Sequence, residues 1–166
     1  MADHPDTAGA DGRMKANNER MAMVIARTPF MKHLAMEFVD AGEGWAKITM
    51  RYQDENSTAF KALHGGAISA LIDTTGAMAA WTTAEIATPK YFGSTIGINV
   101  NYLSAAIGED IFAEGRVLKR GKEIIYSDVR VTNAAGKLLA QGTVTYRIVA
   151  RADGEDVLPA SKDGGR

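Results

Sequence analysis

The residues of this chain whose types could do chemistry gather in one short segment. His64-Gly65-Gly66 precedes a mostly apolar run, and a single carboxylate, Asp73, interrupts that run. An aspartate inside an apolar helix needs solvent, polar partners or a changed protonation state, because burial disfavours its charge. A carboxylate in such a setting can act as a general base or as a nucleophile. The sequence around Asp73 is equally compatible with a solvent-exposed side chain and with a functional one.

The two glycines mark the expected N-terminus of the helix. The first N–H groups of a helix have no intrahelical partner, and the aligned peptide dipoles place partial positive charge there. Glycine has no side chain that would keep a ligand oxygen away, so Gly65 and Gly66 could form an oxyanion hole. A glycine pair that only permits a tight entry into the helix is the commoner role and has the same sequence.

Spacing along the helix limits how these groups could cooperate. Gly66 and Asp73 are seven residues apart, which is about 10 Å along a helix that rises about 1.5 Å per residue. A general base must come within about 3 Å of the proton that it takes, so one helix cannot bring both groups to one carbonyl. Catalysis by both groups therefore predicts a homodimer with two symmetry-related sites, each built from both chains.

The elements around this segment predict a single α+β domain. Residues at helical spacing give the helix one face to bury: Ile68, Ile72, Thr75 and Ala79. Alternating runs at 34–40 and 45–52 precede the helix, and "AGEG" between them is typical of a hairpin. Further alternating runs follow from 94 to 150, with turns at 120–122 and 133–136. Antiparallel runs of this kind predict a curved sheet of about six strands wrapped around one long central helix.

The two ends of the chain have weaker patterns. Residues 17–26 predict a short N-terminal helix that ends before Pro29, because proline disfavours helix at the residue before it. Residues 1–16 and 151–166 lack apolar periodicity, so we expect mobile tails on either side of a domain at 17–150.

Composition excludes several classes of function. A net charge of −1 provides no attraction to nucleic acid or to an anionic membrane surface, and no apolar run reaches the roughly 18 residues that a membrane span needs. The absence of cysteine excludes disulfides, thiol catalysis and cysteine zinc sites. The three histidines lie far apart, so we expect no metal site. No secretory signal opens the sequence, and we expect a cytoplasmic protein.

The motif and the strands that follow it resemble the hotdog-fold acyl-CoA thioesterases of the phenylacetic-acid-degradation (PaaI-like) group. The likeness rests on "HGG" with Asp73 nine residues after His64, on "GSTIGINVNYLSAAIGEDI" and on "GKLLAQGTVTY", and it runs from about His33 to Ile148. It implies a hotdog fold, assembled as a dimer or a dimer of dimers. The implied reaction is hydrolysis of an acyl-CoA thioester, without a cofactor because coenzyme A is part of the substrate.

The resemblance also implies roles for individual residues. Asp73 activates water or is the nucleophile, and the N–H of Gly65, with that of Gly66, polarises the thioester carbonyl. His64 orients this turn or touches the thioester, and Thr95 helps to position the water or Asp73. A basic turn with a close backbone approach suits phosphate, although a solvated hairpin is its commoner role. The residues implied to contact coenzyme A are Lys119, Arg120, Gly121, Lys122 and Tyr102.

The loop before the histidine departs from the family pattern. The family usually has an asparagine six residues before the histidine, where this chain has Thr58. Asn56 is eight residues before His64, and it could reach the site if the loop, two residues longer here, bulges outward. We therefore include Asn56 among the candidate catalytic residues.

Two other functions stay open from the sequence. A hotdog enoyl-CoA hydratase or dehydratase would use an aspartate and a histidine close together before the central helix. Asp54 and His64 are available for that role, but their spacing fits it poorly. A non-catalytic acyl-CoA binder would keep the fold without turnover, and Thr58 in place of the family asparagine favours that function.

Overall fold

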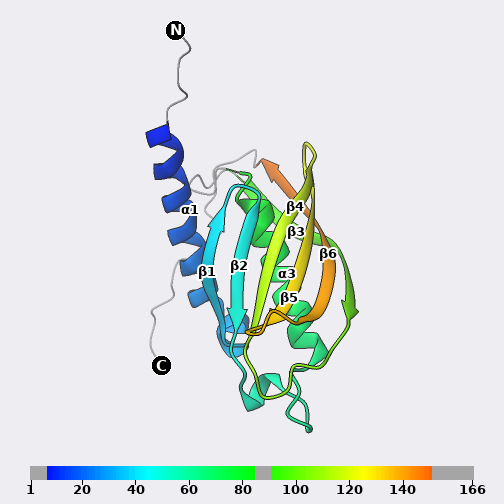
Figure 1. Ribbon diagram of the computed structural model, residues 1–166. Helices are drawn as coiled ribbons and strands as arrows, with labels where there is room; N and C mark the ends of the chain where they lie inside the picture. The colour runs from blue at the N-terminus through cyan, green and yellow to red at the C-terminus, as the bar shows by residue number, and fades with distance from the viewer. Residues whose placement is uncertain (1–6, 85–90, 151–166) are drawn as a thin grey trace, which may run out of the picture.

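A computed structural model describes residues 7–84 and 91–150 as a curved sheet around a central helix (Figure 1). Its six strands form one antiparallel sheet in the order β1-β2-β4-β5-β6-β3. The elements in chain order are α1 (Thr7–Arg27), α2 (Pro29–His33), β1 (Met36–Gly42), β2 (Trp45–Met50), the 3-10 turn η1 (Asp54–Asn56), α3 (Gly65–Trp81), β3 (Tyr91–Tyr102), β4 (Ile111–Arg120), β5 (Ile124–Asn133) and β6 (Leu138–Ala150). The predicted hotdog-type α+β fold is confirmed.

The N-terminal helix is longer than the sequence predicts. α1 begins at Thr7 rather than near Asn17, so residues 7–16, which the sequence analysis assigned to the N-terminal tail, are helical. This stretch contains good helix formers without an apolar stripe, and periodicity therefore does not mark where the helix begins. α1 lies along the outer side of β1 (Figure 1). Pro29 opens α2, because proline is tolerated in the first turn of a helix. The tail expected at 151–166 lies outside the described residues.

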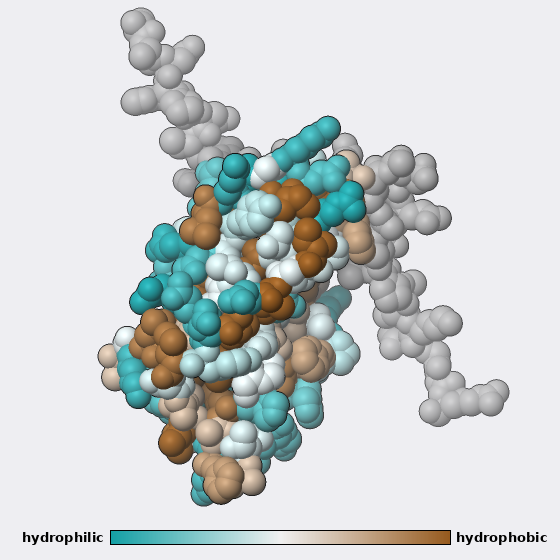
Figure 2. Space-filling view, turned by 90° about the vertical axis from the view of Figure 1, so that its right-hand side faces the viewer, coloured by the Kyte–Doolittle hydropathy of each residue, from teal (hydrophilic) through white to brown (hydrophobic). Residues whose placement is uncertain are grey.

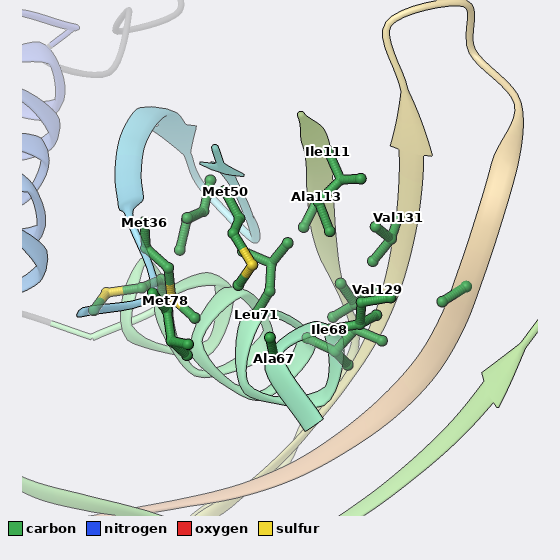
Figure 3. Packing of buried hydrophobic residues seen from close by; sticks show 14 of the residues in the cluster. Met36, Met50, Ala67, Ile68, Leu71, Met78, Ile111, Ala113, Val129 and Val131 are labelled. Atoms are coloured by element: carbon green, nitrogen blue, oxygen red, sulfur yellow. The ribbon is translucent and has the colours of Figure 1, made fainter. Parts of the chain in front are cut away.

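The core lies between α3 and the inner face of the sheet (Figure 3). The predicted helix face is buried, since Ile68, Ile72, Thr75 and Ala79 are each no more than 4% exposed. Side chains from four strands pack against this face, among them Met36, Met50, Ile111, Ala113, Val129 and Val131. No helix of residues 7–84 and 91–150 is long and apolar enough to cross a membrane.

Two glycines let α3 approach the sheet closely. A Cβ added at Gly76 on α3 would lie 2.6 Å from the Val144 Cβ on β6. A Cβ added at Gly142 on β6 would lie 2.8 Å from the Ile72 Cγ2 on the helix. Real Cβ atoms do not pack at such distances, so at each contact a glycine on one element makes room for a side chain of the other: Val144 packs on Gly76, and Ile72 packs on Gly142. This contact sets the position of the helix face that carries Asp73.

The substitution Gly76→Ala should lower the free energy of unfolding by about 1–3 kcal/mol, because the added methyl overpacks the contact with Val144. Alanine is the better helix former by about 1 kcal/mol, so propensity alone predicts the opposite sign. Gly12→Ala in α1 is the matched control, because no atom lies within 4 Å of a Cβ added there. Urea unfolding measures both variants, and a Gly76→Ala protein as stable as Gly12→Ala would contradict the close approach.

Candidate active site

Asp73 on α3 has a fixed hydrogen-bond partner on β3. The Thr95 Oγ1 donates to the Asp73 Oδ1 at 2.6 Å, and both residues are partly exposed. The β3–β6 pairing shifts register between Thr95 and Gly97, and such a bulge redirects nearby side chains. The carboxylate is therefore held on one side and remains open on the other. The structure brings together the two residues that the sequence proposed as partners.

His64 caps the N-terminus of α3. Its Nδ1 accepts a hydrogen bond from the Gly66 N–H at 2.9 Å, so that nitrogen carries no proton in this geometry. The bond occupies one of the two N–H groups expected to form an oxyanion hole. Within the described residues the Gly65 N–H makes no hydrogen bond. Gly65 is thus the glycine whose N–H is free to meet a ligand.

Tyr102 lies over the first turn of α3. Its hydroxyl donates to the Gly65 O at 3.0 Å and is also hydrogen-bonded to the Ser69 Oγ. Strand pairing places Arg120, at the end of β4, and Thr95, on β3, in the same row across the sheet. Tyr102 is seven residues further along β3 than Thr95, roughly 20 Å away. The sequence analysis groups Tyr102 with the basic turn. Within one chain Tyr102 lies instead beside the N-terminus of α3.

The basic turn between β4 and β5 is exposed at the end of the sheet that carries Thr95. The Arg120 Nη1 donates to the Gly121 O at 3.0 Å and to the Lys122 O at 3.4 Å, so this guanidinium folds back onto its own turn. The side chains of Lys119 and Lys122 are exposed. Along their shared row, Arg120 on β4 and Thr95 on β3 are three strand spacings apart, roughly 15 Å across the sheet.

Asn56 is buried, and its amide is used within the loop. The Nδ2 donates to the Leu34 O at 3.1 Å and to the Arg51 O at 2.8 Å, while the Oδ1 accepts from the Gln53 N–H at 3.1 Å. The Asn56 backbone carbonyl accepts from the His64 N–H at 2.9 Å. The structure therefore does not bring the Asn56 amide into the site. What Asn56 does contact is the backbone of His64, through its carbonyl oxygen.

The sequence analysis missed an aromatic pair, Trp81 and Tyr146, beside the strand that carries Thr95. Tyr146 on β6 is the register partner of Thr95, and the Trp81 Nε1–H donates to its hydroxyl at 3.0 Å. Burial raises the pKa of Tyr146, the hydrogen bond from Trp81 opposes this rise, and the charge of Asp73 adds to it. Tyr146 ends the segment "GKLLAQGTVTY" on which the resemblance partly rests, but nothing there singles it out, because it occupies an ordinary alternating position of a strand. Only the pairing of β3 with β6 relates it to Asp73.

Metal ligands do not gather anywhere in the part of the chain that the structure describes. No group of three or more His, Asp or Glu side chains there could hold an ion.

This chain is similar to known thioesterases. The family model of the thioesterase superfamily matches residues 60–140. Acyl-coenzyme A thioesterase 13 from Homo sapiens is 38% identical over 112 residues, which cover 66% of this chain and 77% of the human protein.

Solved structures show the same likeness. Zebrafish thioesterase superfamily member 2 is 30% identical, with a TM-score of 0.67 over 81% of this chain and 96% of the other. The PaaI protein of the Escherichia coli phenylacetic acid degradation operon is 18% identical, with a TM-score of 0.72 over 82% of this chain and 96% of the other. At that identity the PaaI comparison speaks for the fold alone.

His64→Ala should lower the free energy of unfolding by about 1 kcal/mol, because it removes the acceptor for the Gly66 N–H. His64→Asn should restore most of this loss, since asparagine is among the best N-cap residues. Urea unfolding compares the two variants. Equal stability of the alanine and asparagine proteins would show that the cap contributes nothing.

Proposed function

This chain belongs to the thioesterase superfamily and is a thioester hydrolase, and on that premise we propose that it hydrolyses an acyl-CoA with Asp73 acting on water. The name of the human relative supports an acyl-CoA substrate. The observation that carries the role of Asp73 is its hydrogen bond of 2.6 Å from Thr95. This bond orients a partly exposed carboxylate that is the only charged group of α3.

The proposed reaction needs a base and an anion-stabilising donor. The water oxygen attacks the thioester carbonyl carbon while Asp73 takes the water proton, and the carbonyl oxygen becomes an oxyanion. The C–S bond then breaks, the carboxylic acid forms, and the sulfur leaves as the thiol of coenzyme A with the proton from Asp73. The Gly65 N–H at the start of α3 serves as the oxyanion donor, a contribution of roughly 10²–10³ in rate.

The two groups come from different chains in this proposal. Gly65 and Asp73 are eight residues apart on α3, about 12 Å along its axis, so a single helix cannot place both at one carbonyl. β3 is an edge strand of the sheet, and Ile96 and Ile98 on it are 55% and 44% exposed. Figure 2 shows apolar side chains on the side of the molecule that carries this edge. Two such edges paired about a two-fold axis would set the α3 helices antiparallel and bring Gly65 of one chain toward Asp73 of the other.

Coenzyme A is proposed to bind with its phosphates at the basic turn. Lys119 and Lys122 carry exposed ammonium groups, and the Arg120 guanidinium could swing from its own turn to a phosphate oxygen. Tyr102 contacts Gly65, so its contribution to ligand binding belongs to the oxyanion end of the partner chain's site.

The hydratase alternative finds less support. The His64 Nδ1 is used by the Gly66 N–H, and the Asp54 Oδ1 accepts from the Tyr52 hydroxyl at 3.5 Å. No hydrogen bond joins Asp54 and His64 among the described residues, and this favours the hydrolase proposal over an acid–base pair of these two side chains.

Asp73→Asn should reduce kcat for acyl-CoA hydrolysis by at least about 100-fold, because the amide cannot accept the water proton. Asp54→Asn is the matched control and should keep wild-type turnover, since Asp54 lies in the exposed turn η1. Release of coenzyme A from aryl, short-chain and long-chain substrates measures both variants.

Several outcomes would contradict this assignment. Turnover by Asp73→Asn within a few-fold of wild type removes Asp73 from the mechanism. Loss of activity in Asp54→Asn together with hydration of an enoyl-CoA would favour the hydratase. Thermal stabilisation of the wild-type protein by coenzyme A without turnover of any substrate would favour the non-catalytic binder.

A further inference from the structure

Tyr102, the last residue of β3, packs directly on Gly65 in the first turn of α3. A Cβ added at Gly65 would lie 3.4 Å from two carbon atoms of the Tyr102 ring, Cε1 and Cζ, which is a van der Waals contact. The backbone after Tyr102 is fixed, because the N–H groups of Leu103 and Ser104 both donate to the Leu139 O, at 2.9 and 3.0 Å. The sheet therefore brings this ring onto the helix from a fixed direction.

The two hydrogen bonds of the Tyr102 hydroxyl define where its proton points. The hydroxyl is bonded to the Gly65 O at 3.0 Å and to the Ser69 Oγ. A carbonyl oxygen can only accept, so the Tyr102 proton goes to Gly65, and the Ser69 hydroxyl donates to Tyr102. Ser69 lies four residues after Gly65, on the same side of the helix. One turn of α3 therefore supplies both partners of the hydroxyl.

The peptide bonds around the Gly65 N–H are held from several sides. The peptide that joins Gly65 to Gly66 has its carbonyl bonded to Tyr102 and its N–H bonded to the His64 Nδ1. The preceding peptide, which carries the Gly65 N–H, has its carbonyl bonded to the Ile68 N–H at 3.1 Å. A glycine pair can adopt many backbone angles, so these bonds give the N–H its direction. Tyr102 contributes the bond that comes from the sheet.

A hollow of about 390 Å³ lies beside this turn. Gly65 and Tyr102 line it together with the apolar side chains of Leu63, Ile68 and Leu103. Tyr102 is 54% exposed, so its ring borders the hollow while its hydroxyl is bonded to the helix. The turn that Tyr102 contacts is therefore accessible to a ligand.

We propose that Tyr102 is a positioning residue for the oxyanion donor: its hydroxyl, oriented by Ser69, keeps the Gly65 N–H in the direction that a developing oxyanion needs. A donor that is oriented before the reaction stabilises the transition state without a cost of reorganisation. This inference rests on the proposed role of the Gly65 N–H. It gives Tyr102 a function different from the contact with coenzyme A that the resemblance implies, since Tyr102 acts on the substrate carbonyl through Gly65.

Tyr102→Phe tests the proposal, because it removes the hydroxyl and keeps the ring that packs on Gly65. We expect kcat for acyl-CoA hydrolysis to fall about tenfold, a part of the roughly 10²–10³ that an oxyanion donor contributes, with KM within about twofold of wild type. Tyr126→Phe on β5 is the matched control. Tyr126 is 46% exposed, and its variant should keep the wild-type kcat and KM.

Two unreactive ligands separate positioning from packing. In the first, a methylene group replaces the sulfur of an acyl-CoA, so this ketone keeps the carbonyl oxygen. The second is an alkyl thioether of coenzyme A, which lacks that oxygen. Tyr102→Phe should weaken binding of the ketone about fivefold, the effect of one hydrogen bond, and should leave binding of the thioether within about twofold. Isothermal titration calorimetry measures both affinities.

Ser69→Ala tests the orientation of the hydroxyl. The variant removes the group that donates to Tyr102, so kcat should fall by a smaller factor, about two- to threefold. In the Tyr102→Phe background the same substitution should change kcat no further, because Ser69 acts through the Tyr102 hydroxyl.

The outcomes distinguish this inference from the function on which it rests. A wild-type kcat in Tyr102→Phe would overturn the proposal, and so would equal weakening of the ketone and the thioether, because that pattern belongs to a residue that contacts coenzyme A or supports the fold. Additive effects of Ser69→Ala and Tyr102→Phe would overturn the part assigned to Ser69. If Asp73→Asn is inactive while Tyr102→Phe matches wild type, the positioning role alone fails. If Asp73→Asn retains turnover, the proposed role of Asp73 fails, and the two ligand affinities still test Tyr102.

Discussion

The hydrogen bond from Thr95 to Asp73 is the contact on which the site and the fold jointly depend. It offers a polar partner to the one charge of an otherwise apolar helix, and such a charge is costly to bury without one. The contact exists only because α3 lies close to the sheet, and Gly76 and Gly142 make that approach possible. A register shift between Thr95 and Gly97 bends β3 at this point, and such a shift redirects nearby side chains. Core packing and the orientation of the carboxylate that we propose as catalytic therefore have the same structural cause.

The N-terminus of α3 divides its polar groups between structure and chemistry. His64 takes the Gly66 N–H as a cap, and the carbonyl of Asn56 holds the His64 N–H. What remains for a substrate oxygen is the Gly65 N–H, at the positive end of the helix dipole. Since α3 places the Gly65 N–H about 12 Å from Asp73 along the same helix, the two groups cannot meet at one carbonyl within one chain. In the proposed reaction, a second copy of the chain would supply the missing group.

Sequence patterns predict much of this arrangement, and their failures have physical reasons. Alternation and helical spacing predict the sheet and the buried face of α3, because each reports which side of an element meets the core. The start of α1 at Thr7 has no such signal, since helix propensity there acts without an apolar stripe. The resemblance suggests Thr95 as a partner of Asp73, and the two side chains are hydrogen-bonded. It does not indicate that the Asn56 amide bonds to backbone carbonyls of Leu34 and Arg51. Tyr146 could not be found from sequence, because strand register and not chain spacing brings it to Thr95.

The shared site is tested most directly by mixing two inactive chains. Gly65→Pro removes the proposed donor N–H, and proline suits the first position of a helix; His64 before it has φ −66° and ψ 135°, which a following proline accepts. Each of Gly65→Pro and Asp73→Asn should be nearly inactive alone. Co-refolded in equal amounts, random pairing gives one intact site in half of the dimers, so turnover should rise to about a quarter of wild type. A mixture no more active than its parents would contradict a site built from two chains.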